Sequence, residues 1–183
     1  MKITSTAIPE VLLLEPVVHE DERGYFMETF RKSFLHEHGI DMDFVQDNQS
    51  MSKKGTLRGL HYQLEYPQGK LARALSGQIF DVAVDLRKAS PSFGHWVGEF
   101  LTAENRKQLW IPPGFAHGFL VLSDTAELSY KCTDYFQPED DHSLLWSDPE
   151  VNIKWPGINE EITLSEKDQA GKLLSEASVF DRV

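Results

Sequence analysis

The sequence predicts a mostly β protein, built as an antiparallel sandwich or barrel. Short segments rich in β-forming residues alternate apolar and polar side chains, and turn signals separate them at close intervals. Helical periodicity is weak and confined to two short segments. The chain has 183 residues, of which 40% are apolar and 26% charged, so it can bury a core without disulfide or metal support. We therefore expect a single domain over residues 1–183, with many short strands and few helices.

The turn signals divide the chain into its elements. They are glycine or aspartate after a polar or charged residue, at 23–24, 54–55, 68–69, 76–77 and 123–124. Strands are predicted at 44–50, 56–64, 71–76, 79–87, 108–111, 118–122 and 127–136. The strand over 79–87 is the clearest, because alternate apolar residues from Phe80 to Leu86 would share one face. The two predicted helices are 32–38 and 165–174, the second with Ser165 as its N-cap.

Charge and cysteine content exclude several classes of protein. The formal net charge of −11, from 29 acids and 18 bases, argues against a nucleic-acid binder. Cys132 is the single cysteine, which rules out an intramolecular disulfide and favours a reducing cytoplasm. No apolar run approaches the ~20 residues that span a membrane, and no signal peptide is expected. Residues 51–80 hold five Lys or Arg and one acid, which indicates either a local anion site or solvated turn charges.

The residues best suited to chemistry lie in two predicted strands. In the run 57–63, strict alternation sends Arg58 and His61 to opposite faces; they share a pocket only if the strand is irregular, and Gly59 would tolerate a bulge. A lone strand histidine is otherwise structural. The Pro-x-Gly-x-x-His pattern that ends at His117 resembles the second half of the cupin barrel signature. Metal-binding cupins add two further histidines and a glutamate, so His61 and His117 alone are too few for zinc or non-haem iron.

Ten motifs then follow one another in the order of a known family. They occupy residues 23–28, 46–48, 57–63, 68–70, 80–85, 91–94, 110–112, 114–119, 130–131 and 164–168. Over residues 8–172 the chain resembles the dTDP-4-dehydrorhamnose 3,5-epimerases. The resemblance implies a cupin-like antiparallel jelly-roll barrel with a few short helices, no metal and no cofactor. It also implies a cytoplasmic homodimer with strand exchange, which acts on dTDP-4-dehydro-6-deoxy-D-glucose in dTDP-L-rhamnose synthesis.

The resemblance assigns four catalytic roles. C3 and C5 of that substrate both adjoin the C4 ketone, so removal of a proton gives an enolate and needs a base, a stabilising group and an acid. His61 would be the base and Asp168 its dyad partner. Lys70 would stabilise the enolate, and Tyr130 would be the acid on the opposite face. Without the resemblance, Asp168 reads as a first-turn helix acid, Lys70 as an exposed turn lysine and Tyr130 as a structural tyrosine.

The same resemblance assigns residues to substrate binding. Arg23 and Arg58 would contact the pyrophosphate, a role that suits a planar guanidinium, and Phe136 would stack on thymine. The other predicted contacts are Phe26, Glu28, Gln46, Asn48, His117, Asp141 and Lys167. In the family, the strand with Phe26 and Glu28 crosses to the partner subunit. Asp141 stands where the family usually has a glutamate.

Three other functions remain open on sequence grounds. An epimerase of C3 alone, or of C5 alone, would keep the same base, lysine and phosphate contacts. A metal-dependent cupin oxygenase would need the ligands that are missing here. A sugar-nucleotide-binding cupin without activity would not need His61, Lys70, Tyr130 and Asp168 together.

Overall fold

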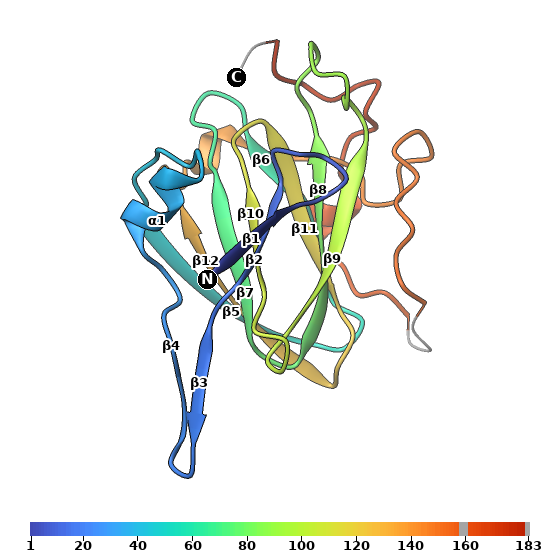
Figure 1. Ribbon diagram of the computed structural model, residues 1–183. Coiled ribbons are helices and arrows are strands. Elements are labelled where there is room, and N and C mark those ends of the chain that lie inside the picture. Colours follow the sequence, from blue (N-terminus) through green and yellow to red (C-terminus); the bar gives the residue numbers. More distant parts are fainter. Residues whose placement is uncertain (158–160, 182–183) are drawn as a thin grey trace.

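The computed structural model describes residues 1–157 and 161–181, and its main strands pair antiparallel in two facing sheets (Figure 1). The first sheet has six strands in the order β1-β2-β10-β7-β12-β5. Their bounds are β1 Lys2–Ser5, β2 Leu12–Glu15, β10 Gln108–Ile111, β7 Lys70–Ser76, β12 Thr125–Cys132 and β5 Gln46–Lys53. The second sheet has five strands, in the order β13-β6-β11-β8-β9. Their bounds are β13 Asp141–Ser143, β6 Leu57–Gln63, β11 Phe115–Val121, β8 Gln78–Asp85 and β9 Trp96–Thr102. This mostly β, cupin-like architecture confirms the predicted fold class.

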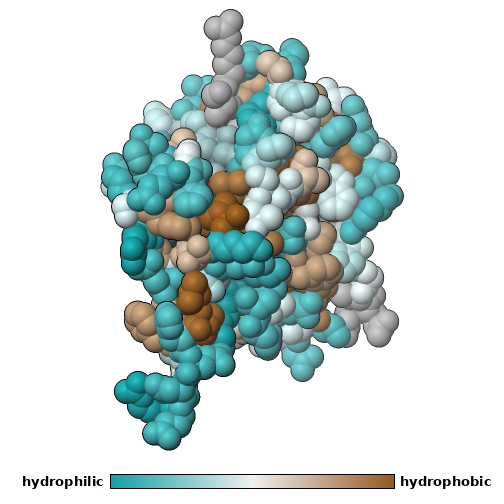
Figure 2. All heavy atoms as spheres, viewed as in Figure 1, coloured by the Kyte–Doolittle hydropathy of each residue, from teal (hydrophilic) through white to brown (hydrophobic). Residues whose placement is uncertain are grey.

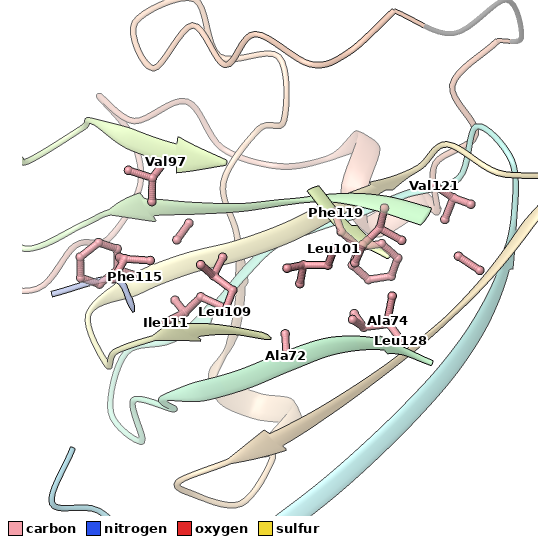
Figure 3. Close-up of a cluster of buried hydrophobic side chains, with 14 of the residues drawn as sticks. Ala72, Ala74, Val97, Leu101, Leu109, Ile111, Phe115, Phe119, Val121 and Leu128 are labelled. Atoms are coloured by element: carbon pink, nitrogen blue, oxygen red, sulfur yellow. The ribbon is translucent and has the colours of Figure 1, made fainter. Parts of the chain in front are cut away.

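Apolar side chains from both sheets fill the space between them. Figure 3 shows Ala72 and Leu109 from the first sheet facing Leu101 and Phe119 from the second. All four are at most 5% exposed. Burying such side chains is the main force that holds the two sheets together, because each removes apolar surface from water.

Strand β8 is buried on both faces. Phe80 and Val84 lie on its outer face with Val82 and Leu86, as the alternation predicted. This face is covered by the C-terminal segment, orange to red in Figure 1, which contributes Val151, Leu174 and Phe180. The opposite face of β8 points into the barrel, where Asp81 is completely buried. A charged side chain is thus placed inside the barrel near the cavity described below.

The helices are short. Helix α1 spans Lys32–Glu37, close to the predicted 32–38, and a 3₁₀ helix η1 spans Pro138–Asp140. Helix α2 spans only Glu166–Gln169, so the prediction of a helix over 165–174 is wrong at its end. The chain leaves α2 because the backbone of Lys172 bonds to that of Ser143 and Leu145. Gly171 fits this close approach, where a Cβ would come 2.8 Å from the Leu145 Cα. No helix in the described residues is long and apolar enough to cross a membrane.

Strand boundaries also differ from the prediction, most of all in β5, β11 and β12. Strand β5 spans Gln46–Lys53, where 44–50 was predicted. Strand β11 begins three residues before the predicted 118–122, at Phe115. The strand predicted at 127–136 ends at Cys132, because the chain then leaves the sheet and its backbone bonds to side chains instead. Strands β1, β2, β3 (Val18–Asp21), β9 and β13 were not predicted, and their short or irregular patterns explain why.

A two-stranded arm extends from the body of the protein. Strands β3 (Val18–Asp21) and β4 (Gly24–Met27) pair only with each other, and the hairpin projects away from both sheets (Figure 1). Hydrophilic atoms cover its tip in Figure 2, yet Tyr25 and Phe26 are 58% and 71% exposed. Such exposure of two aromatic side chains is unusual for a surface without a partner.

Candidate active site

An irregularity in strand β6 brings Arg58 and His61 to one cavity. His61 pairs with His117 and Arg58 pairs with Phe119, so three steps along β6 match two along β11. This is a β-bulge, and it contains Gly59 as the sequence allowed. Gly59 has a φ of +117°, and a Cβ there would lie 2.6 Å from the Cα of Gly118. Only glycine fits, because both the left-handed conformation and the close approach exclude a side chain.

The cavity lies between the sheets and has a volume of about 270 Å³. Eight of the predicted site residues line it: Arg58, His61, Lys70, His117, Tyr130, Phe136, Asp141 and Lys167. His61 comes from the five-stranded sheet, whereas Lys70 and Tyr130 come from the six-stranded sheet. Groups on opposite walls can therefore act on opposite faces of one bound molecule.

His61 and Asp168 form a dyad. Nε2 of His61 lies 2.5 Å from Oδ1 of Asp168, and Ser165 Oγ donates to the other carboxylate oxygen at 2.8 Å. Asp168 is only 3% exposed. Burial raises the pKa of its carboxyl, but the hydrogen bonds from His61 and Ser165 outweigh burial and hold this pKa below its usual value. The carboxylate is therefore ionised at neutral pH and can orient and stabilise a charged imidazole.

Asp168 lies in the first turn of helix α2, as its local sequence indicates, and its side chain also contacts His61. Ser165 is the N-cap of α2, and its Oγ accepts a hydrogen bond from the Asp168 backbone N–H at 3.1 Å. The same short helix directs the Asp168 carboxylate at His61. The second imidazole nitrogen, Nδ1, has no hydrogen-bond partner among the described residues and is free to accept a proton.

Lys70 is the first residue of β7 and is 7% exposed, so it is not the exposed turn lysine that the sequence allowed. Burial lowers the pKa of its ammonium, while the nearby Cys132 and Asp141 act in the opposite direction. Within residues 1–157 and 161–181 its ammonium has no hydrogen-bond or ion-pair partner. A buried cation without a protein partner is suited to a negatively charged ligand atom.

Tyr130 faces the same cavity from β12. It packs against the core beside Leu128, on the inward face that the alternation predicted. Burial raises the pKa of its phenol, which keeps the hydroxyl protonated at neutral pH. In the described part of the chain that hydroxyl has no hydrogen-bond partner, although a buried tyrosine usually has one.

A second imidazole–carboxylate pair lies beside the first. Nε2 of His117 lies 2.5 Å from Oδ1 of Asp81, and His117 is the direct cross-strand neighbour of His61. The other oxygen of Asp81 is buried without a partner among the described residues. Asp81 was not among the predicted site residues, although an acidic residue in the middle of an otherwise apolar strand is a signal for one. The pair fixes the orientation of the His117 ring, which lines the cavity.

The other predicted binding residues differ in whether they reach the cavity. Phe136 is 48% exposed at its rim, and the Asp141 carboxylate forms an ion pair with Lys167. Gln46 and Asn48 share a face of β5, as predicted, and Gln46 donates to Asn48 at 3.1 Å. Neither of them lines the cavity. Ser50, farther along the same face, does, and the sequence analysis did not single it out.

Three predicted residues lie on or near the arm and do not reach the cavity of their own chain. Arg23 pairs with Asp21 at 2.6 Å, and Glu28 pairs with Arg31 at 2.7 Å. Phe26 is mostly exposed. Within one chain, then, the structure does not bring Arg23, Phe26 and Glu28 together with His61.

In the described residues, no group of three or more His, Cys, Asp or Glu side chains is placed to hold a metal ion. Proton transfer at carbon is the chemistry that these groups support, and a cupin-like epimerase is the class that the fold and the cavity define. The chain belongs to the dTDP-4-dehydrorhamnose 3,5-epimerase family, whose model matches residues 5–176.

Known relatives match this chain over nearly its whole length. The dTDP-4-dehydrorhamnose 3,5-epimerase of Pseudomonas aeruginosa is 54% identical over 98% of this chain and 99% of its own length. That of Neisseria gonorrhoeae is 56% identical over 97% of this chain, which spans 54% of that longer relative. The solved dTDP-6-deoxy-D-glucose-3,5-epimerase of Legionella pneumophila, in complex with dTDP-4-keto-L-rhamnose, has a TM-score of 0.94 and 52% identity, with 97% and 94% of the two chains covered.

The family's fold also occurs in an enzyme named for a single inversion. A 3'-monoepimerase from Streptomyces bikiniensis, solved with dTDP-quinovose, has a TM-score of 0.86 and 35% identity, over 93% of this chain and 87% of its own. Likeness of fold alone therefore does not distinguish double from single epimerisation.

Proposed function

We propose that the protein epimerises dTDP-4-dehydro-6-deoxy-D-glucose at C3 and C5 and gives dTDP-4-dehydro-L-rhamnose, for dTDP-L-rhamnose synthesis in the cytoplasm. The observation that carries the proposal is the His61–Asp168 dyad, which opens on a cavity whose opposite wall holds Lys70 and Tyr130. Membership of the epimerase family supports it.

Proton abstraction is assigned to His61. Its Nε2 donates to Asp168, so the lone pair on Nδ1 takes the proton from the carbon next to the C4 ketone. The electron pair of that C–H bond moves into the ring, and negative charge develops on the C4 oxygen. The buried ammonium of Lys70 stabilises this enolate, and Asp168 stabilises the imidazolium that has formed.

Reprotonation is assigned to Tyr130. Its hydroxyl donates a proton to the same carbon from the face opposite His61, since the two residues come from different sheets. The configuration is then inverted, and the phenolate and imidazolium return to their starting states by exchange with solvent. A raised phenol pKa suits this role, because the acid must stay protonated until the enolate forms.

The rest of the cavity would hold the nucleotide. Arg58, whose Nε donates to Ser52 Oγ at 2.9 Å, is placed to contact the pyrophosphate. The exposed ring of Phe136 offers a face for thymine. His117, Lys167 and Asp141 complete the binding groups on the cavity wall. Gln46 and Asn48 lie on β5, where they pair with Cys132 and Tyr130 of β12.

We also propose that the protein works as a homodimer, with the arm of one chain at the cavity of the other. The exposed Tyr25 and Phe26 and the projecting hairpin support this arrangement. Arg23, Phe26 and Glu28 would then contact the partner's substrate. The test mixes inactive Arg23→Ala and His61→Ala proteins. Recovery of about a quarter of the activity is expected from hybrid dimers with one intact site; no recovery would contradict the exchange of arms.

The second candidate is an epimerase of one carbon, which the likeness to the 3'-monoepimerase favours. Proton NMR of dTDP-4-dehydro-6-deoxy-D-glucose with the protein in D₂O separates the two. Deuterium at both C3 and C5, with an L-sugar product trapped by reduction, is the result expected here. Exchange at one carbon would support the single epimerase. A folded protein that binds dTDP and exchanges neither carbon would refute both and favour a binding cupin without activity.

A further inference from the structure

The segment that carries Phe136 is held by side chains instead of by a sheet. Residues 134–137 follow the end of β12 and belong to no strand. Gln63, on β6, bonds to this segment twice: its Nε2 donates to the Tyr135 carbonyl at 3.1 Å, and its Oε1 accepts from the Gln137 N–H at 2.8 Å. The same Nε2 donates to the Tyr66 carbonyl at 2.7 Å.

Two further glutamines bond to the same segment. Gln68 donates from Nε2 to the Asp134 carbonyl at 2.8 Å, and the Gln46 Oε1 accepts from the Phe136 N–H at 3.0 Å. Gln46, Gln63 and Gln68, which we call the glutamine clamp, come from β5, β6 and the loop before β7. They therefore hold the segment from three places in the fold.

The three glutamine side chains already make hydrogen bonds within the protein. Gln63 is 3% exposed and Gln68 is 8% exposed. The Gln46 Nε2 donates to Asn48 while its Oε1 accepts from Phe136, so both ends of its amide are also occupied. Both ends of the Gln63 amide are bonded to backbone groups, and Gln68 is bonded through its Nε2, so contact of these atoms with a ligand would break an existing bond.

The clamp also connects the part of the cavity that would hold the nucleobase with the part that contains His61 and Lys70. Gln63 lies two residues after His61 on the same strand, and Gln68 lies two residues before Lys70. On its other side, the clamp bonds to the segment that carries Phe136, whose half-exposed ring lies at the rim of the cavity. The ring can serve as a stacking platform only if its backbone is fixed, because each freely rotating group loses entropy on binding.

We propose that Gln63 and Gln68 are positioning residues that hold the Phe136 ring against the nucleobase and so determine affinity for the nucleoside diphosphate, without acting in the chemical step. This rests on the proposed function, in which Phe136 receives thymine. Gln46, which the family resemblance assigned to substrate contact, would act as the third positioning residue.

A double-mutant cycle tests the proposal. Binding of dTDP is measured by calorimetry for wild type, Gln63→Met, Phe136→Leu and the double variant. A base–aromatic stack contributes enough that its disturbance by Gln63→Met should raise Kd about tenfold. In the Phe136→Leu background the same change should raise Kd by less than about twofold, because the ring it positions is gone. At saturating sugar nucleotide, kcat of Gln63→Met should stay within about threefold of wild type.

Two further variants guard against simple destabilisation. Gln68→Met removes one hydrogen bond and should change Kd in the same direction by a smaller factor, even if Gln63→Met folds poorly. Asp148→Asn is the matched structural control: its buried carboxylate also holds three backbone N–H groups, of Glu150, Val151 and Leu174, away from the cavity. It should lower the melting temperature and leave the dTDP Kd unchanged.

Additive effects in the double variant, or equal losses of kcat and affinity in Gln63→Met, would overturn the proposal. Unchanged affinity in both glutamine variants would do the same. Because dTDP binding is measured without turnover, a protein that binds dTDP but does not epimerise would refute only the proposed function. Absence of dTDP binding by wild type would overturn both.

Discussion

Replacement of Asp168 with Asn tests the dyad most directly. The change keeps the shape of the side chain and removes its negative charge, while Ser165 Oγ and the His61 ring remain beside it. The imidazolium that forms when His61 takes the substrate's proton then has no charged partner. We expect kcat to fall sharply while the affinity for dTDP stays close to that of wild type, because Asp168 lies behind His61 and does not line the cavity.

The size of the effect follows from the contact. Opposite charges about 4 Å apart attract by about 4 kcal/mol at the effective dielectric constant found near protein surfaces. The 2.5 Å separation of Nε2 and Oδ1 places the two charges in that range, and the His61 side chain is 34% exposed, so this dielectric is appropriate. Since each 1.36 kcal/mol of barrier is a factor of ten, the expected loss is about 1000-fold in kcat.

The assay is proton NMR of dTDP-4-dehydro-6-deoxy-D-glucose in D₂O, with dTDP affinity from calorimetry. Asp148→Asn is the control, because it makes the same change in another buried carboxylate outside the cavity. The reasoning is refuted if Asp168→Asn retains more than about a tenth of the wild-type kcat. The Asp168 charge would then lower the activation free energy by less than about 1.4 kcal/mol. A parallel loss of dTDP affinity would also refute it, since it would indicate a general disturbance of the site.

Three other substitutions have separate expected outcomes. Lys70→Met should lower kcat about 100- to 1000-fold with dTDP affinity kept, as measured by NMR and calorimetry. Burial lowers the pKa of the Lys70 ammonium, so in wild type the charge is complete below that pKa and lost as pH rises through it. The rate should therefore decline on the alkaline side before an ordinary lysine titrates near ~10.4, and a constant rate up to that pH would contradict the role. Tyr130→Phe should reduce completed inversion more than deuterium exchange; equal losses would argue against Tyr130 as the separate acid. Gly59→Ala should cost about 2–4 kcal/mol of unfolding free energy in urea, because its Cβ would meet the Gly118 Cα at 2.6 Å, and unchanged stability would contradict the need for glycine.

Much of the fold could be predicted because it depends on local pattern. Alternation placed Phe80 and its neighbours on one face of β8, and put Tyr130 on the inward face of β12. The Ser165 cap was predicted from residue type alone. The end of β12 could not be predicted, because residues 133–136 have a strand-like composition and leave the sheet only where glutamine side chains bond to their backbone.

The candidate site was predicted unevenly, and the differences have physical causes. From residue chemistry alone, His61 was expected to be a structural histidine and Asp168 an acid in the first turn of a helix. Only the family resemblance paired the two residues. Asp81 was missed because its burial inside the barrel depends on the facing sheet, which no local pattern contains. The arm residue Arg23 was predicted for binding, yet it lies outside its own chain's cavity, so a role in binding would need the second chain of the proposed dimer.

By itself, the sequence determined where many of the strands lie, which chemical groups are available, and the family to which the chain is similar. These properties depend on side-chain type and on periodicity over a few residues. Only the tertiary structure decided which groups meet. His61 and Asp168 are 107 residues apart in the chain, and strand pairing together with the N-cap of α2 brings them into contact. The same long-range packing buries Lys70 and fixes Phe136 through the glutamine clamp, because burial and hydrogen bonding are properties of the assembled sheets.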